Sequence, residues 1–291
     1  MSNIHVITDA DLDGAGSFLC VKYAYKNANI TYQATTEKTF LEDISFFDFK
    51  KYDLVFICDL NLKKEEIKIV DNKNVIIFDH HAEHENNLKY YEKAKTIVKE
   101  YSSCTKLLYH TLKLESKLDD KQKLLIKIVD DYDSYQLKIP FSKQLDQVFW
   151  TYTGDRIKKF TDDFYEGFSG FNQFQKNALK IVENKIEKFF KEETIHIGIL
   201  KLGGKEYKIA GTFVTFSPNE IAERVIKTYN VDFIIMINMN AKNVYLRKNS
   251  KCSLNMGKLA EKLMDGGGHD DSAGGKLNET IINITKFLKP V

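Results

Sequence analysis

The sequence has few cysteines and no long apolar run. It contains four cysteines, Cys20, Cys58, Cys104 and Cys252, none of them in a CxxC pair. Widely spaced thiols of this kind predict reduced core cysteines and therefore a cytoplasmic protein. No segment approaches the roughly 20 apolar residues that span a bilayer. The N-terminus also lacks a basic stretch followed by an apolar one, so we expect neither export nor membrane insertion.

An excess of charge of either sign is missing as well. The 291 residues include 43 Lys and Arg against 41 Asp and Glu, a formal net charge of +2. Without a global basic field, the sequence does not favour a protein that binds long duplexes. Its 43% hydrophobic and 29% charged residues are typical of a globular protein. The length suits one large domain or two ordinary ones.

Three acids alternate near the N-terminus, directly after an apolar run. Residues 4–17 read IHVITDADLDGAGS and contain Asp9, Asp11 and Asp13. If the strand continued, these three carboxylates would share one side of it and repel each other. A hard divalent cation relieves such repulsion. An acidic surface turn is the alternative, and this stretch alone leaves both open.

Apolar runs that indicate buried strands recur through the first half of the chain. Apolar runs at 4–8, 52–60 and 74–81 and an apolar-polar run at 30–35 are separated by expected helices such as 17–27 and 63–71. Buried runs that alternate with helices are typical of a doubly wound, mostly parallel α/β sheet. Ligands bind at the carboxyl ends of the strands in such sheets. We therefore expect the site where these runs end.

Acids and histidines stand at those ends. Besides 9–13, they are Asp59, the run 79–81 (DHH), and the run 130–133 (DDYD) after an expected helix at 121–131. Carboxylates with one or two imidazoles suit Mn²⁺ or Mg²⁺ better than Zn²⁺. If about six carboxylates and two imidazoles converge, two metal ions are more sensible than one. A hydrogen-bonded histidine pair at a strand end is the alternative for His80 and His81.

The second half of the chain has a different texture. Residues 171–194 carry apolar side chains at near-helical intervals and predict a helix that links two domains. Strand-like segments follow, with an expected helix at 256–264. We therefore expect a first domain at 1–170, a linker helix at 171–194, and a smaller α/β domain at 195–291.

A glycine-rich stretch, DGGGHDDSAGG, occupies residues 265–275. Glycines such as Gly267 and Gly268, just before His269, let backbone N–H groups surround an anion. Arg247 lies on an expected strand upstream, and a guanidinium holds a phosphate or carboxylate bidentately. This combination predicts a phosphate clamp in the second domain, whereas a flexible surface loop is the alternative.

Together these motifs resemble a known family. DADLDG, the strand ending in Asp59, DHH and DDYD look like the successive motifs of the DHH phosphoesterase superfamily. GGGHDDSAGG is similar to the GGGHxxAAG signature of its DHHA1 domain, with Ser272 where the family usually has Ala. Asp9 stands where many nano-RNases have His, an arrangement more like the RecJ exonucleases. The resemblance implies an N-terminal DHH domain and a C-terminal DHHA1 domain.

The resemblance also implies residue roles. Asp9 and Asp11 would hold one Mn²⁺, and Asp13, His80 and Asp131 the other. Asp59 would bridge the two ions, and Asp59, Asp13 and His81 would be catalytic, with His81 facing the scissile phosphate. The expected substrate-binding residues are Arg247, Gly267, Gly268 and His269. Among the acids of 130–133, Asp131 is the expected ligand, but Asp130 and Asp133 stay open.

By the same resemblance, the activity is a two-metal phosphodiesterase that uses activated water to hydrolyse short oligonucleotides to mononucleotides. Two divalent cations are expected, Mn²⁺ first and Mg²⁺ as the alternative. The layout is closest to the nano-RNases, which makes short RNA the first substrate. The alternatives are a cyclic-nucleotide or cyclic-dinucleotide phosphodiesterase, a 3′-phosphoadenosine 5′-phosphate phosphatase, a single-strand DNA exonuclease, or an inactive nucleotide-binding protein. A homodimer is compatible with the sequence.

Overall fold

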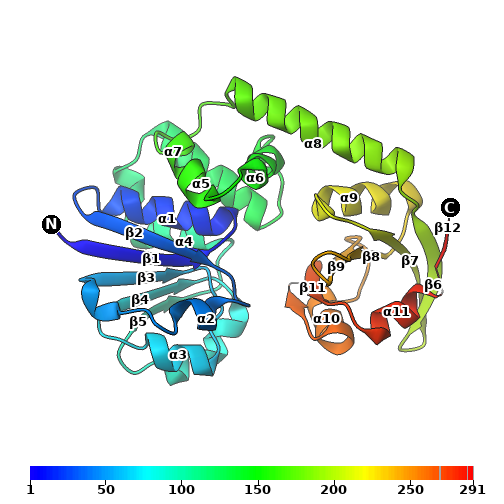
Figure 1. Cartoon of the computed structure of the whole chain (residues 1–291), viewed down its shortest axis with the longest axis horizontal. Coiled ribbons are helices and arrows are strands. Elements are labelled where there is room, and N and C mark those ends of the chain that lie inside the picture. The colour runs from blue at the N-terminus through cyan, green and yellow to red at the C-terminus, as the bar shows by residue number, and fades with distance from the viewer. Residues whose placement is uncertain (269, 287, 291) are drawn as a thin grey trace. The chain divides into compact units, whose positions relative to one another are not determined.

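The chain folds into two compact units. The computed structural model describes residues 1–268, 270–286 and 288–290. Unit 1 comprises Met1–Leu179 and unit 2 comprises Lys180–Val291. The boundary falls inside helix α8 (Gln173–Glu192). This helix lies within the segment 171–194 that was expected to be a linker helix (Figure 1). The finer domain limits given above remain a prediction.

Unit 1 is built on a five-stranded sheet in which all paired strands are parallel. Its strands, in the spatial order β2-β1-β3-β4-β5, are β2 (Asn29–Thr35), β1 (Asn3–Asp9), β3 (Leu54–Cys58), β4 (Val75–Asp79) and β5 (Lys95–Val98). The parallel sheet confirms the expected architecture. Since β1, β3 and β4 are neighbours, their carboxyl ends meet at one edge, where ligands bind in such folds.

Helices cover both faces of this sheet (Figure 1). On one face, Val6, Phe56 and Phe78 pack against a layer that includes helices α1, α4 and α5. The alternate strand residues, such as Ile57 and Ile77, pack with α2 and α3 on the other face. The helices of unit 1 before α8 are α1 (Leu12–Ala24), α2 (Phe40–Ile44), η1 (Phe49–Lys51), α3 (Lys64–Val70), η2 (Ala82–Tyr90), α4 (Cys104–Thr111), η3 (Leu114–Ser116), α5 (Asp120–Asp133), α6 (Ser142–Thr151) and α7 (Arg156–Phe164).

The first acidic stretch does not continue the strand, so its three acids do not lie along one side of a strand. β1 ends at Asp9 and α1 begins at Leu12, earlier than the helix expected from residue 17. Asp11 is the N-cap, because its Oδ1 accepts a hydrogen bond of 2.8 Å from the backbone N–H of Gly14. A Cβ at Gly14 would lie 2.0 Å from the carbonyl oxygen of Asp9, so the turn needs glycine.

In the described part of unit 2, the sheet is mixed and has the spatial order β10-β11-β9-β8-β7-β6-β12. Helix α9 covers one face, and α10 and α11 cover the other. This α/β unit was expected, although α9 was not. The elements are β6 (His196–Leu202), β7 (Lys205–Phe213), α9 (Pro218–Tyr229), β8 (Phe233–Asn238), β9 (Asn243–Lys248), α10 (Met256–Met264), β10 (Gly267–Gly268), β11 (Ser272–Lys276), α11 (Glu279–Thr285) and β12 (Lys289–Pro290).

The four cysteines are buried and carry free thiols, as expected. Within residues 1–268, 270–286 and 288–290, no helix combines the length and apolar character needed to cross a bilayer.

One buried histidine of β1 lies among aromatic rings. His5 is 5% exposed, and its Nδ1 lies 2.7 Å from the Thr31 hydroxyl oxygen. The ring centroids of Phe47 and Tyr52 lie 4.9 and 4.7 Å from that of His5. Its Nε2 is buried and has no hydrogen-bond partner among the described residues. Burial lowers the pKa of His5 from 6.5 to about 4, because a charged ring here would lose its hydration.

We predict that His5 makes the fold sensitive to acid. Above pH 6.5 the ring is neutral in both states, and below it the unfolded chain takes up the proton first, so stability is lost as pH falls toward about 4. Denaturant titrations should show that His5→Gln removes about 1–2 kcal/mol of this pH-dependent loss. Subtracting the pH profile of the variant from that of wild type removes the contribution of the other titrating groups, which both proteins share. Parallel pH profiles for wild type and variant would contradict the prediction.

Candidate metal centre

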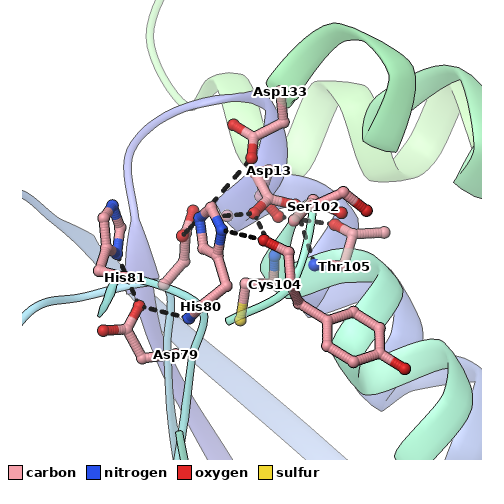
Figure 2. A network of polar contacts seen from close by, with 12 residues as sticks. Asp13, Asp79, His80, His81, Ser102, Cys104, Thr105 and Asp133 are labelled. Carbon is pink, nitrogen blue, oxygen red and sulfur yellow. Dashed lines mark hydrogen bonds and ion pairs between the residues drawn. The ribbon is translucent and has the colours of Figure 1, made fainter. Parts of the chain in front are cut away.

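The candidate site lies where the carboxyl ends of β1, β3 and β4 meet the ends of three helices. His80 directly follows β4, Asp59 follows β3, and Asp13 lies in the first turn of α1. Asp133 is the last residue of α5, and the start of α4 contributes backbone amides (Figure 2). Residues distant in the sequence thus come together at the edge predicted for ligands.

His80 is the centre of this cluster. Its Nδ1 lies 3.2 Å from the carbonyl oxygen of Tyr101, so this nitrogen carries the proton and donates. Its Nε2 then faces three carboxylates, at 3.2 Å from Asp59, 3.6 Å from Asp133 and 3.9 Å from Asp13. An imidazole whose outer N–H is held by a backbone carbonyl is the usual arrangement of a metal-ligating histidine. Figure 2 shows the His80 ring beside Asp13 and Asp133.

Asp13 is fixed by the start of α4. The side chain is buried, and its two oxygens accept hydrogen bonds from the backbone N–H groups of Cys104 and Thr105 at 2.7 and 2.9 Å. These amides form the positive end of the helix dipole, which favours a carboxylate. The Thr105 hydroxyl also donates to the carbonyl oxygen of Asp13 at 2.9 Å. The position of this acid is therefore set before any ion binds.

Asp59 has an unusual backbone conformation. Its φ is 61°, in the left-handed region that non-glycine residues rarely adopt. Its N–H donates to the carbonyl oxygen of Phe78 at 2.9 Å, and its side chain is buried. Strain of this kind, on the order of 1–3 kcal/mol, clusters at functional sites. The strained backbone brings the carboxylate to within 3.2 Å of His80.

The acids at this edge repel each other. Burial and then Asp11 raise the pKa of Asp9 to about 8, and burial and then Asp13 raise that of Asp11 to about 6. Burial, followed by repulsion from Asp13, also raises the pKa values of Asp59 and Asp133 well above the usual range. The cluster therefore holds more buried negative charge than its histidines neutralise. Divalent cations fit such a site, because they supply the missing positive charge.

Two groups of side chains have the spacing of metal ligands. They are Asp59, His80 and His81, and Asp13, His80 and Asp133, with the ligand atoms of each group within 4.8 Å of one another. Carboxylate oxygens with imidazole nitrogens suit Mn²⁺ or Mg²⁺. Asp9 and Asp11 are outside these groups, yet both are close enough to raise the pKa of Asp59. Their predicted role as ligands remains a prediction.

The structure does not bring Asp131, the expected ligand from DDYD, to the cluster. Its oxygens accept hydrogen bonds from the N–H groups of Lys138 and Ile139 at 3.0 and 2.9 Å and from the Ser142 hydroxyl at 2.5 Å. These bonds close the loop after α5. Asp133 faces His80 instead, because residues two positions apart on a helix point to different sides. Asp133 is one of the two alternatives that the sequence leaves open.

Asp130, the remaining acid of DDYD, contacts the start of α4 and the two serines at 102 and 103. It accepts hydrogen bonds from the hydroxyls of Ser102 and Ser103 and from Lys106 Nζ, at 2.5, 3.0 and 2.8 Å. These bonds tie α5 to the segment that presents the Tyr101 carbonyl to His80. Sequence reasoning missed this supporting role, because a serine pair has no motif that marks it.

His81 is held by the aspartate that precedes the histidine pair. Its Nδ1 donates to Asp79 Oδ1 at 2.7 Å, as Figure 2 shows. Burial lowers the pKa of His81, but the hydrogen bond and charge of Asp79 raise it more, to about 9. Asp79 is fully buried and lies outside the two ligand groups, and its Oδ1 also accepts the backbone N–H of His80, so its contacts orient His81. The expected contact of His81 with a phosphate remains a prediction.

The expected substrate residues of unit 2 are partly engaged within the protein. Arg247 lies on β9, where its Nε donates to Asn219 Oδ1 at 2.8 Å. Its Nη1 donates to the carbonyl oxygens of Leu246 and Ala273 at 2.7 and 3.2 Å. These bonds orient the guanidinium plane, and a substrate role for Arg247 remains a prediction. His269 lies outside the described residues.

Close packing explains most of the glycine-rich stretch. A Cβ at Gly266 would lie 2.0 Å from the carbonyl oxygen of Gly274, and one at Gly268 would lie 2.5 Å from that of Ser272. Both glycines let the short hairpin of β10 and β11 form. Gly267 differs, because a Cβ there would meet nothing within 4 Å. Of the described glycines of β10, Gly267 is therefore the one that packing does not require to be glycine.

The fold and this centre define an α/β metal-dependent hydrolase. Residues 3–131 match the model of the DHH family, N-terminal domain, and residues 217–291 match that of the DHHA1 domain. The two matches together cover more than half of the chain. The chain therefore belongs to the DHH/DHHA1 phosphoesterase superfamily, and its activity class is metal-dependent phosphoester hydrolysis.

Solved structures share this fold. The pGpG-specific phosphodiesterase PggH from Vibrio cholerae is 15% identical, with a TM-score of 0.58 over 97% of this chain and 96% of that one. RecJ in complex with Mn²⁺ from Thermus thermophilus is 13% identical, with a TM-score of 0.57 over 98% and 51%. An exopolyphosphatase-related protein from Bacteroides fragilis is 15% identical, with a TM-score of 0.52 over 98% and 90%. No curated protein matches by sequence.

We predict opposite effects for two neighbouring acids of α5. Asp133→Asn removes a half-buried charge that its surroundings disfavour, so the metal-free protein should melt no earlier than wild type. The same variant should bind Mn²⁺ at least about tenfold more weakly, because it loses a candidate ligand. Thermal melts with EDTA and calorimetric titration with Mn²⁺ measure the two effects.

Asp131→Asn is the matched control. It weakens the three hydrogen bonds that close the loop after α5, so stability should fall by about 1–3 kcal/mol. Mn²⁺ affinity of the folded protein should stay within about twofold of wild type. The reverse pattern, with Mn²⁺ affinity lost only in Asp131→Asn, would restore Asp131 as the ligand.

Adjacent glycines of unit 2 should respond differently to a methyl group. Gly266→Ala forces backbone atoms apart and should destabilise unit 2 by about 1–3 kcal/mol. Gly267→Ala should change stability by less than about 0.5 kcal/mol. If Gly267 binds substrate, turnover of this stable variant should nevertheless fall. Equal stability losses in denaturant titrations would contradict the packing argument.

Proposed function

We propose that the protein is a phosphodiesterase that hydrolyses short oligoribonucleotides, dinucleotides first, to mononucleotides. The observation that carries this proposal is the cluster at His80, whose Nε2 faces carboxylates from three different elements. A site of this composition suits the hydrolysis of a phosphodiester, where negative charge builds up on the phosphoryl oxygens.

Two likenesses support the choice of substrate. The structure of a pGpG-specific phosphodiesterase, an enzyme named for a linear dinucleotide, aligns with nearly the whole of this chain. RecJ from Thermus thermophilus shares this fold but is about twice as long as this chain, whereas the match to another manganese-bound exonuclease RecJ covers 88% of that chain. At these identities the likeness itself concerns the fold, so the substrate is our inference. The first motif, with Asp9, is more like that of the RecJ exonucleases, which makes single-stranded DNA an alternative substrate.

Several side chains would bind the cations. Asp13, Asp59, His80 and Asp133 would be the principal ligands, with Asp9 and Asp11 beside them. Bound divalent ions would lower the pKa of water and neutralise charge on the phosphate. The ring of His81, oriented by Asp79, would contact the phosphate and either stabilise its charge or protonate the leaving oxygen.

We predict Mn²⁺-dependent release of mononucleotides, fastest from a labelled RNA dinucleotide. The comparison substrates are a longer RNA, a single-stranded DNA, a cyclic dinucleotide and 3′-phosphoadenosine 5′-phosphate, each tested with Mn²⁺ and with EDTA. Preference for one of these substrates would replace short RNA with that substrate. No turnover of any of them by protein that binds Mn²⁺ would reject the proposed activity.

Asp59→Asn should abolish turnover and leave the fold intact, since it removes the charge of the predicted bridging residue. Asp162→Asn is a suitable control, because Asp162 forms an exposed pair with Lys158 on the surface of α7. That variant should keep full activity. An active, folded Asp59→Asn protein would rule out the bridging role.

A further inference from the structure

Hydrogen bonds link His81 to a chain of three further polar side chains, Asp79, His84 and Tyr91. His84 Nδ1 lies 2.6 Å from Asp79 Oδ2, and His84 Nε2 lies 2.9 Å from the Tyr91 hydroxyl. The other oxygen of Asp79 accepts the Nδ1–H of His81 at 2.7 Å and the backbone N–H of His80 at 2.9 Å. His84 is completely buried.

The local fold explains why the two histidines share one aspartate. The segment after His81 is the 3₁₀ helix η2, and the N–H of His84 donates to the carbonyl oxygen of His81 at 3.1 Å. A 3₁₀ helix has three residues per turn, so residues three apart lie on one side. Asp79, at the end of β4, therefore receives a ring N–H on each of its oxygens.

His84 itself does not offer a ring nitrogen to a metal ion or a substrate. Both of its ring nitrogens lie within hydrogen-bond distance of protein atoms, and it belongs to neither group of candidate ligands. No other part of the site described above needs it. Its role is to hold the Asp79 carboxylate in one orientation. Without His84, the carboxylate could rotate about its Cβ–Cγ bond, and Oδ2 would be buried without this hydrogen-bond partner.

We propose that His84, held by Tyr91, is a positioning residue that fixes the ring of His81 through Asp79. With Oδ2 of Asp79 bonded to His84, Oδ1 stays aligned with Nδ1 of His81, so the opposite side of the His81 ring faces the site in one orientation. The kinetic part of this inference rests on the proposed function. The structural part, one hydrogen-bond chain from Tyr91 to His81, does not.

The kinetic test is a double-mutant cycle between residues 81 and 84. We expect His84→Leu to lower kcat by about 10–100-fold, as loss of supporting hydrogen bonds does in such sites, with little change in KM. His84→Asn, which keeps an amide donor near the position of Nδ1, should recover most of this loss. In a His81→Ala background, His84→Leu should change kcat by less than about twofold, because the residue it positions is gone.

Tyr23→Phe is a control for simple destabilisation. It removes a buried hydroxyl that donates to the carbonyl oxygen of Tyr165 at 2.7 Å, in another part of unit 1. It should leave kcat of the folded enzyme unchanged. Additive losses from His81→Ala and His84→Leu, or an unchanged kcat in His84→Leu, would overturn the proposal.

A second readout does not require activity. With ¹⁵N-labelled histidine, NMR of wild type should show two ring N–H protons, from His81 and His84, shifted downfield by their bonds to Asp79. His84→Leu should remove one signal and broaden or move the other, and the milder Tyr91→Phe should weaken the His84 signal. A His81 signal unchanged in His84→Leu would reject the proposal whatever the protein hydrolyses. A shifted signal in a protein without phosphodiesterase activity would reject only the proposed function.

Discussion

Repulsion among buried and half-buried carboxylates is the constraint on which the rest of unit 1 depends. Asp9, Asp11, Asp59 and Asp133 all have raised pKa values, because burial removes their hydration and each feels another acid nearby. Such a cluster destabilises the folded state unless cations bind to it. The centre is therefore stable in one of two states, partly protonated or metal-bound, and near neutral pH metal ions compete with protons for the same oxygens.

The surrounding structure holds these acids in place against their repulsion. Helix α4 points its first amides at Asp13, and the carbonyl of Tyr101, just before α4, fixes His80. Asp130 fastens that segment to α5, the helix that ends with Asp133. The strained backbone of Asp59 is supported by a hydrogen bond to β4. The ligands are thus positioned by contacts that do not include the metal, which reduces the cost of organising the site when an ion binds.

The sequence predicts the type of residue at this site better than the exact position. Buried runs that end in acids predict the parallel sheet and its functional edge, because both follow from local periodicity. Which acid of DDYD faces the centre depends on the phase of α5 and on the loop after it, neither of which the motif encodes. Asp131 was expected there, yet three donors from 138–142 hold it elsewhere. Likewise, the helix after the first motif begins at Leu12 rather than at residue 17, because Asp11 caps it, a role that the acidic run does not by itself reveal.

Unit 1 contains the candidate metal centre, and unit 2 contains the glycine-rich stretch, for which substrate binding remains a prediction. Every described candidate ligand comes from unit 1. The set of side chains at this candidate centre suits phosphoester hydrolysis of many substrates and does not by itself select one. Selection requires groups that contact the sugar, base or terminal phosphate. In unit 2, the hairpin geometry makes Gly266 and Gly268 packing residues, so the predicted substrate contacts of this unit are those of Arg247 and Gly267. If these two residues contact substrate as predicted, differences in substrate between proteins that share this centre are more readily sought in unit 2 than among the metal ligands.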